Sequence, residues 1–167
     1  SGNIVSNEPF TVAGTGTSAT TGVLRNISGT NTLGGAVTLD AASLIASDAG
    51  TLTLGGAVSS ANYALTLSGN GDLVLAGAVS LGSAGLTKEG LGVATLSAAN
   101  TFSGATLVNA GALRLEDAEQ AHVGAAREHA DDLVVDDVVV DDVVVGVVEV
   151  IGVGNNLELI VVPDVGT

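Results

Sequence analysis

Hydrophobic and polar residues alternate in short runs along the chain before residue 116. Clear examples are Thr51-Leu52-Thr53-Leu54 and Asp72-Leu73-Val74-Leu75, each of which directly follows a glycine. A period of two is typical of strands that bury one face and expose the other. Pairs such as Gly55-Gly56 separate the runs and favour tight turns, because glycine adopts positive φ angles without strain. The pattern predicts many short strands joined at sharp corners.

These runs recur at a nearly constant spacing. Each begins with the phrase Gly-x-x-x-Leu or a weaker copy of it, and the opening glycines are Gly22, Gly50, Gly71, Gly92 and Gly111. Their spacings are 28, 21, 21 and 19 residues. A fixed period of this length indicates a solenoid, in which each repeat is one coil that buries its apolar side against its neighbours. The longest spacing predicts an enlarged coil from Gly22 to Ala49, with its extra residues in a loop.

The stretch from Gly85 to Leu115 contains two copies of this phrase. It resembles the passenger-associated repeat of Gram-negative autotransporters. The matching residues are Leu86-Thr87-Lys88-Glu89-Gly90, Ala94-Thr95-Leu96-Ser97, Ala99-Asn100-Thr101-Phe102-Ser103-Gly104 and Val108-Asn109-Ala110-Gly111-Ala112-Leu113-Arg114-Leu115. The resemblance implies a right-handed parallel β-helix that is exported to the cell surface. It implies no catalytic residue, because the repeat is a scaffold.

Composition agrees with an all-β solenoid. Hydrophobic residues make up 46% of the chain, yet Met, Trp and Cys are absent and 24 residues are glycine. A compact globular core normally uses more large side chains, whereas small interior residues suit thin coils. At 21 residues per coil, the 167 residues would make roughly eight coils.

The chain divides into four segments by composition. Residues 1–21 are polar and predict an N-terminal cap or an incoming strand, and residues 22–115 hold the β-solenoid repeats. Residues 116–130 have alanines at helical spacing and predict a short helix or a loop. Residues 131–167 are acidic and valine-rich, and they predict C-terminal strands and a cap.

Three Asp-Asp pairs follow one another at a period of five residues in the last segment. They are Asp131 and Asp132, Asp136 and Asp137, and Asp141 and Asp142. An odd period would swap the buried face of a flat strand at each repeat, so each pair predicts a corner between short valine strands. Stacked carboxylates at such corners would suit Ca²⁺, and we expect no other metal or cofactor. The alternative is a row of like charges that protects exposed edges and aids solubility.

The formal net charge of −14 limits the partners of the chain. Its basic residues are Arg25, Lys88, Arg114 and Arg127. Nucleic acids and anionic membrane surfaces bind patches of Lys and Arg, so we expect neither as a partner. Direct membrane insertion is not expected either, because no apolar run has the length of a membrane span.

Motifs of known enzyme classes are missing from the sequence. It contains no Gly-x-Ser-x-Gly elbow, no Walker loop and no His-Glu-x-x-His. A carbohydrate-active β-helix enzyme would need clustered acids, whereas the acids before residue 116 lie in separate coils. These acids are Glu8, Asp40, Asp48, Asp72 and Glu89. We therefore predict no catalytic residue, a surface turn at Lys88-Glu89, and a hydrogen-bonded asparagine ladder at a corner containing Asn70 and Asn109.

The sequence thus predicts a non-catalytic, extracellular or cell-surface solenoid that acts as a structural or adhesive rod. Expected partners are other copies of the chain, end to end or side to side, and host or matrix glycans or proteins. The alternative is a subunit of an extracellular filament joined head to tail. It rests on the apolar stretch Val147–Val162 and the strand-like pieces Ile4-Val5 and Phe10-Thr11-Val12, because open solenoid ends are templates for pairing.

Overall fold

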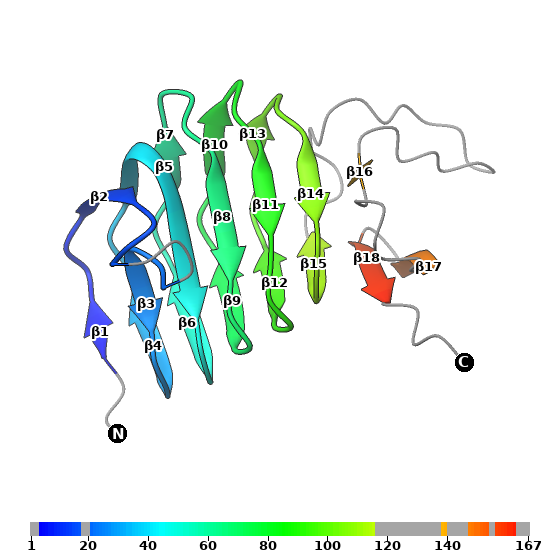
Figure 1. Cartoon of the computed structure of the whole chain (residues 1–167), viewed down its shortest axis with the longest axis horizontal. Coiled ribbons are helices and arrows are strands. Elements are labelled where there is room, and N and C mark those ends of the chain that lie inside the picture. Colours follow the sequence, from blue (N-terminus) through cyan, green and yellow to red (C-terminus); the bar gives the residue numbers. More distant parts are fainter. Residues whose placement is uncertain (1–3, 18–20, 116–137, 140–146, 154–155, 163–167) are drawn as a thin grey trace.

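The computed structural model describes residues 4–17, 21–115, 138–139, 147–153 and 156–162. The regular elements in these residues are all strands, and none of them forms a helix that could cross a bilayer. Figure 1 shows successive coils stacked side by side from the β1 end to β15. The described residues up to Leu115 form a parallel β-solenoid.

One side of the solenoid is a single parallel sheet, which we call the first face. Its strands are β1 (Val5–Ser6), β4 (Thr30–Leu33), β6 (Thr51–Leu54), β9 (Asp72–Leu75), β12 (Val93–Leu96) and β15 (Ala112–Leu115). Every neighbouring pair in this series is parallel. Two more strands extend the same sheet, β18 (Asn156–Val162) and β17 (Val147–Val153).

The second sheet supplies the other two faces. The second face holds β2 (Phe10–Gly14), the first part of β5 (Val37–Ser47), β7 (Val58–Ser60), β10 (Val79–Gly82) and β13 (Thr101–Phe102). The third face holds β3 (Leu24–Asn26), the second part of β5, β8 (Leu65–Ser68), β11 (Leu86–Lys88), β14 (Thr106–Val108) and β16 (Val138–Val139). The long strand β5 belongs to both faces because it bends from one to the other without a break.

The pairing register confirms the predicted period. Thr51 pairs with Asp72 on the first face, and Leu65 pairs with Leu86 on the third, so each step advances by 21 residues. The last step is shorter, since Val93 pairs with Ala112. About four turns follow this period within the described residues. The eight coils suggested by the chain length are therefore not confirmed.

The core is a column of aliphatic side chains inside the coils. Burying one such side chain stabilises a fold by about 1.5–3 kcal/mol. The alternation predicted from the sequence is confirmed at Leu52, Leu54, Leu73 and Leu75, which are at most 3% exposed. Fully buried members from the three faces are Leu54, Leu75, Val58, Val79, Leu65, Leu67 and Leu86.

The enlarged coil lies one turn earlier than the sequence suggested. Leu24 pairs with Ile45 at the regular separation of 21 residues, but Gly14 pairs with Ser43 at 29. The extra residues are therefore between β2 and β3, where the backbone N–H of Gly22 donates to the Thr15 carbonyl at 2.9 Å. The repeat phrase of the second coil begins at Gly29 and not at Gly22. This copy of the phrase is easily missed, because Asn31 stands at the position where the next coil has Leu52.

Candidate functional site: polar clamps at a corner of the solenoid

Three buried polar side chains of the described coils, those of Asn26, Ser47 and Lys88, lie where the third face turns into the first. The backbone leaves the strand ladder at this corner, so its carbonyl groups need other hydrogen-bond donors. Two side chains, those of Lys88 and Asn26, donate there to carbonyls of two consecutive coils. We call each of these arrangements a corner clamp.

The first clamp is built on Lys88 at the end of β11. Its ammonium Nζ donates to the carbonyls of Glu89 at 2.7 Å, Gly90 at 2.8 Å and Ala110 at 3.2 Å. An ammonium group has three N–H donors, so all of them are used. Glu89 and Gly90 belong to the same corner as the lysine, whereas Ala110 belongs to the corner of the next coil. The side chain therefore links two coils.

The strand alternation explains why a charged residue lies inside. Leu86 and Lys88 both point inward in β11, and Lys88 pairs with Leu67 on one side and Val108 on the other. Leu67 and Val108 are fully buried, and Lys88 is only 1% exposed. The methylene chain of Lys88 thus occupies an aliphatic position of the core, and its end reaches the corner. The surface turn predicted for Lys88 is wrong, because a lysine stem packs well in apolar surroundings when its head group finds acceptors.

Burial sets the protonation behaviour of this lysine. Burial lowers the pKa of Lys88 from its ordinary value of 10.5 to about 8, and the nearby carboxylates of Glu89 and Asp72 act in the opposite direction. A lysine with such a pKa can act as a nucleophile or base where substrate can reach it. Here the amine is enclosed and its protons are given to backbone carbonyls. The arrangement supports a structural role and not a catalytic one.

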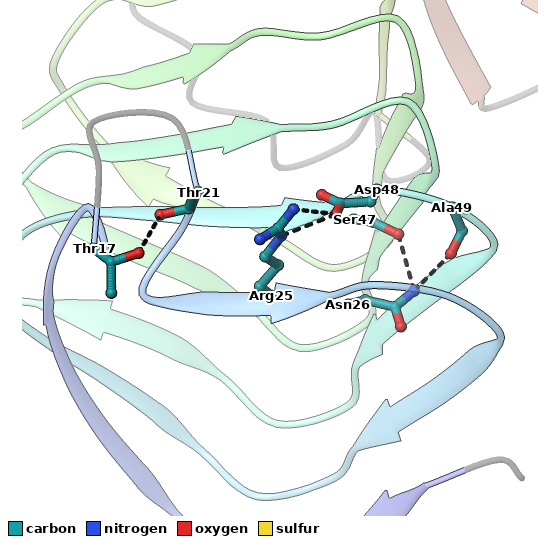
Figure 2. A network of polar contacts seen from close by, with 7 residues as sticks. All are labelled: Thr17, Thr21, Arg25, Asn26, Ser47, Asp48 and Ala49. Atoms are coloured by element: carbon teal, nitrogen blue, oxygen red, sulfur yellow. Dashed lines mark hydrogen bonds and ion pairs between the residues drawn. The ribbon is translucent and has the colours of Figure 1, made fainter. Parts of the chain in front are cut away.

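The second clamp is built on Asn26, three coils away from the first (Figure 2). Its side-chain Nδ2 donates to the carbonyl of Ala49 at 3.1 Å and to Ser47 Oγ at 3.0 Å, with a longer contact to Gly29. Ala49 directly precedes Gly50, the first residue of its coil, as Ala110 directly precedes Gly111. The two clamps therefore reach the same position in the next coil, although one uses an amide and the other an ammonium group.

A chain of asparagine hydrogen bonds extends the second clamp to the first strand. Asn31 Nδ2 donates to Asn26 Oδ1 at 2.6 Å, and Asn31 Oδ1 accepts from the backbone N–H of Ile4 at 2.8 Å. Asn26 and Asn31 lie in one corner of the same coil, so they do not form the ladder between stacked coils that the sequence predicted. Within the described coils Asn70 and Asn109 share no hydrogen bond, because Asn109 aligns with the corner after Lys88 and not with Asn70.

Charged groups elsewhere in the described coils do not converge. Arg25 and Asp48 form an ion pair on the surface, with Arg25 Nε 2.9 Å from Asp48 Oδ2 (Figure 2). Asp72 Oδ1 accepts from the backbone N–H of Val93 at 3.1 Å. Glu8, between β1 and β2, and Asp40, in β5, are both exposed. No group of three or more acidic or histidine side chains that would hold a metal occurs in the part of the chain that the structure describes.

The aspartates predicted to bind calcium lie outside the described residues. These are Asp131, Asp132, Asp136, Asp137, Asp141 and Asp142. Two of the three residues between the second and third pairs, Val138 and Val139, are described, and they form β16, which pairs in parallel with β14. A short valine strand after the second pair agrees with the prediction for this run. Calcium binding stays a prediction.

A row of hydroxyl groups follows the second face, which we call the hydroxyl row. Pairing register places one hydroxyl residue of each coil in line. The members are Thr11, Thr38, Ser59, Ser80 and Thr101. Their side chains are exposed or half-buried, and the oxygens of Ser80 and Thr101 are 2.7 Å apart. The sequence alone does not single out this row, because Ser and Thr also occur at many other positions.

Comparison with known proteins gives one match. Residues 86–115 match the family model described as the passenger-associated-transport-repeat, and this range covers β11 to β15 and the Lys88 clamp. Searches of curated proteins and of solved structures found no match to the chain. The segment 86–115 is thus a passenger-associated transport repeat by its match, and the parallel β-solenoid that contains it fits a structural domain of the autotransporter-passenger type.

Proposed function

We propose that this chain is a non-catalytic rod segment that stands on the bacterial cell surface as part of an autotransporter-type passenger. The observation that carries the proposal is the use of the buried polar groups. Lys88 and Asn26 spend their donors on backbone carbonyls of consecutive coils. They are therefore placed to hold the coils together, and none of their donors is left for a substrate.

Rigidity follows from the way the coils are joined. Each inner coil pairs with the coil before and the coil after it on all three faces, and the aliphatic column runs through them without interruption. Solenoids of this type gain their stability from interfaces between neighbouring repeats. A rod of this kind would carry loops and faces away from the membrane without needing a large globular core.

The test places the chain between a secretion signal and an autotransporter translocator in a Gram-negative host. We expect the displayed chain to be recognised by antibody on intact cells and to resist added protease, since folded coils offer few cleavable loops. Leu96→Asp is the matched control, because it puts a charge at an inward position that is 1% exposed. If the unmodified chain stayed inside the cell, or if protease digested it as fast as the Leu96→Asp control, the proposal would be contradicted.

The hydroxyl row favours an adhesive role for the same rod. Aligned hydroxyl groups on a flat strand face can donate and accept hydrogen bonds, and no charge interrupts this row. We propose a neutral polysaccharide as the ligand, because the net charge of −14 opposes acidic polymers. Cosedimentation with cellulose should be lost in Ser59→Lys and kept in Thr53→Lys, which changes the first face. Equal binding by both variants, or stronger binding to alginate than to cellulose, would rule out this role.

A further inference from the structure

The first-face sheet has two ends, and both are strands with one unpaired side among the described residues. Its order is β1-β4-β6-β9-β12-β15-β18-β17, so β1 and β17 are the terminal strands. An unpaired strand edge offers a row of free N–H and C=O groups to another strand. The two edges belong to one sheet, and they lie at opposite ends of it (Figure 1).

The core is open at the β1 end of the described coils. Inward-facing apolar residues of the first coil are only partly buried, because no described coil stacks on their outer side. In the next coil, Val37, Leu39 and Ile45 are at most 2% exposed. The corresponding partly buried residues of the first coil are Phe10, Val12 and Leu24. This end of the column resembles a cut surface of a core, which favours an additional layer of apolar strand.

The edge strand itself adds exposed apolar groups. Ile4 and Val5 are 62% and 69% exposed, and they are among the most exposed large hydrophobic residues in the described part of the chain. The carbonyls of Ile4 and Ser6 accept from Thr32 and Gly34 of the second coil. Alternate residues of a strand direct their backbone groups to opposite sides, so the N–H and C=O of Val5 face the open edge.

The strand at the other end has the direction that a further coil would need. β18 is antiparallel to β15, and β17 is antiparallel to β18. The two reversals make β17 parallel to β15 and therefore to β1. Its sequence, Val-Val-Glu-Val-Ile-Gly-Val, is apolar at most positions. A second copy displaced along the rod axis would thus bring a parallel apolar strand to β1.

We propose that the solenoids join head to tail, with the β17 edge of one copy pairing in parallel with the β1 edge of the next. The partner is a second copy of this chain because one chain carries both edges and cannot close them on each other from opposite ends. The contact is heterologous, so each added copy presents a new free edge and the assembly grows as a filament. The surface role proposed above does not depend on this association.

The first measurement is the mass of the purified full chain by light scattering and sedimentation from micromolar to near-millimolar concentration. We expect the average mass to rise steadily above the 16.1 kDa of the monomer, without stopping at the dimer. A monomer at every concentration would overturn the proposal. A species that stops at the dimer would also overturn it, because a non-closing contact has no such end point.

Two edge variants identify the strands in contact. Val5→Pro removes the one N–H of β1 that faces the open edge and keeps the bonds to β4, and proline is tolerated on edge strands. Val148→Lys places a charge on β17, which opposes edge pairing. We expect each variant alone to be monomeric, and an equimolar mixture to form dimers that do not grow, since only one of the two contacts remains possible.

The controls separate loss of pairing from loss of folding. Val5→Thr keeps the N–H at the edge and should assemble like the unmodified chain. Each variant should also keep the circular dichroism spectrum and melting curve of the unassembled parent. If either variant still assembles alone, or if the mixture stays monomeric while both variants are folded, β1 and β17 are not partners and the proposal is wrong.

Discussion

At the scale of single residues, Lys88 is the buried charged side chain of the described coils. It is the lysine of a chain that has only four basic residues, and its ammonium is shared by carbonyls of two coils. Charged groups are rarely fully buried unless they are paired or hydrogen-bonded. The three carbonyl acceptors meet this requirement. The methylene chain of the lysine therefore packs in the core while its ammonium group satisfies carbonyls of the corner.

Acylation should report whether Lys88 is enclosed. An amine-reactive ester should modify the chain terminus quickly and Lys88 at least about a hundredfold more slowly than in denaturant, because reaction requires the corner to open. Peptide mass spectrometry over time measures both rates in one sample, and the terminal amine is the internal control. Equal rates for Lys88 in native and denaturing buffer would show that the lysine is exposed.

The lowered pKa of Lys88 predicts a dependence of stability on pH. Between about 8 and 10.5 the unfolded chain keeps the proton that the folded chain has released, so the unfolded state binds more protons. Stability therefore rises with pH through this window. The melting temperature should increase from pH 8 to pH 9.5 in the parent and increase less in Lys88→Met. A parent and a variant with parallel curves would contradict the assignment.

The position of Lys88 could not be predicted from its own residue type. Alternation in Leu86-Thr87-Lys88 places the lysine on the inward face, whereas its charge favours the surface. Burial is possible because backbone carbonyls accept its protons, and one of these carbonyls, that of Ala110, belongs to the next coil. Gly29 was missed for a related reason. Asn31 stands where the next coil has a leucine, and its hydrogen-bond partner Asn26, five residues earlier in the same corner, is not marked by the repeat phrase.

At the scale of elements, strands were easier to predict than corners. The strands at Thr51–Leu54 and Asp72–Leu75 have the predicted bounds because alternation continues to both of their ends. The stretch Val37–Ser47 is one long strand, β5, because the extended backbone continues through the bend between the second and third faces. The corners depend on contacts between coils, and a single coil does not contain that information.

The corner between β6 of the first face and β7 of the second face contains two adjacent glycines, Gly55 and Gly56, whose substitution by alanine should have different effects on stability. A Cβ at Gly56 would lie 2.4 Å from the Gly35 carbonyl oxygen, whereas a Cβ at Gly55 would have its nearest contact at 3.3 Å. Backbone on the neighbouring coil cannot move aside as a side chain can. Gly56→Ala should therefore lower the free energy of unfolding by about 1–3 kcal/mol, the usual cost of overpacking.

Chemical denaturation of the two glycine variants provides the comparison. Gly55→Ala is the matched control because it adds the same methyl group to the same turn. Its stability should change by less than about 1 kcal/mol. If Gly55→Ala were as damaging as Gly56→Ala, the stacking distance between the coils at this corner would be wrong.

At the scale of the whole molecule, the period explains more than any motif. Consecutive coils pair in parallel on three faces, and the insertion that enlarges the first coil lies in a connection, the one between β2 and β3. Sequence periodicity predicted this arrangement because each coil repeats the same alternation. The number of coils was harder to predict, because dividing length by period assumes that the repeat continues after Leu115.

Stacking of consecutive coils in register is the central claim, and paired cysteines test it most directly because the chain has none of its own. Thr32, Thr53 and Val74 lie in one outward row of the first face. Adjacent strands are about 4.8 Å apart, within the Cα separation that disulfides accept. Oxidation should therefore join Thr53→Cys to Val74→Cys efficiently, as seen by non-reducing electrophoresis and peptide mapping. The pair Thr32→Cys and Val74→Cys, two coils apart at about 9.6 Å, should stay reduced. Equal cross-linking of both pairs, or of neither, would contradict the stacked solenoid.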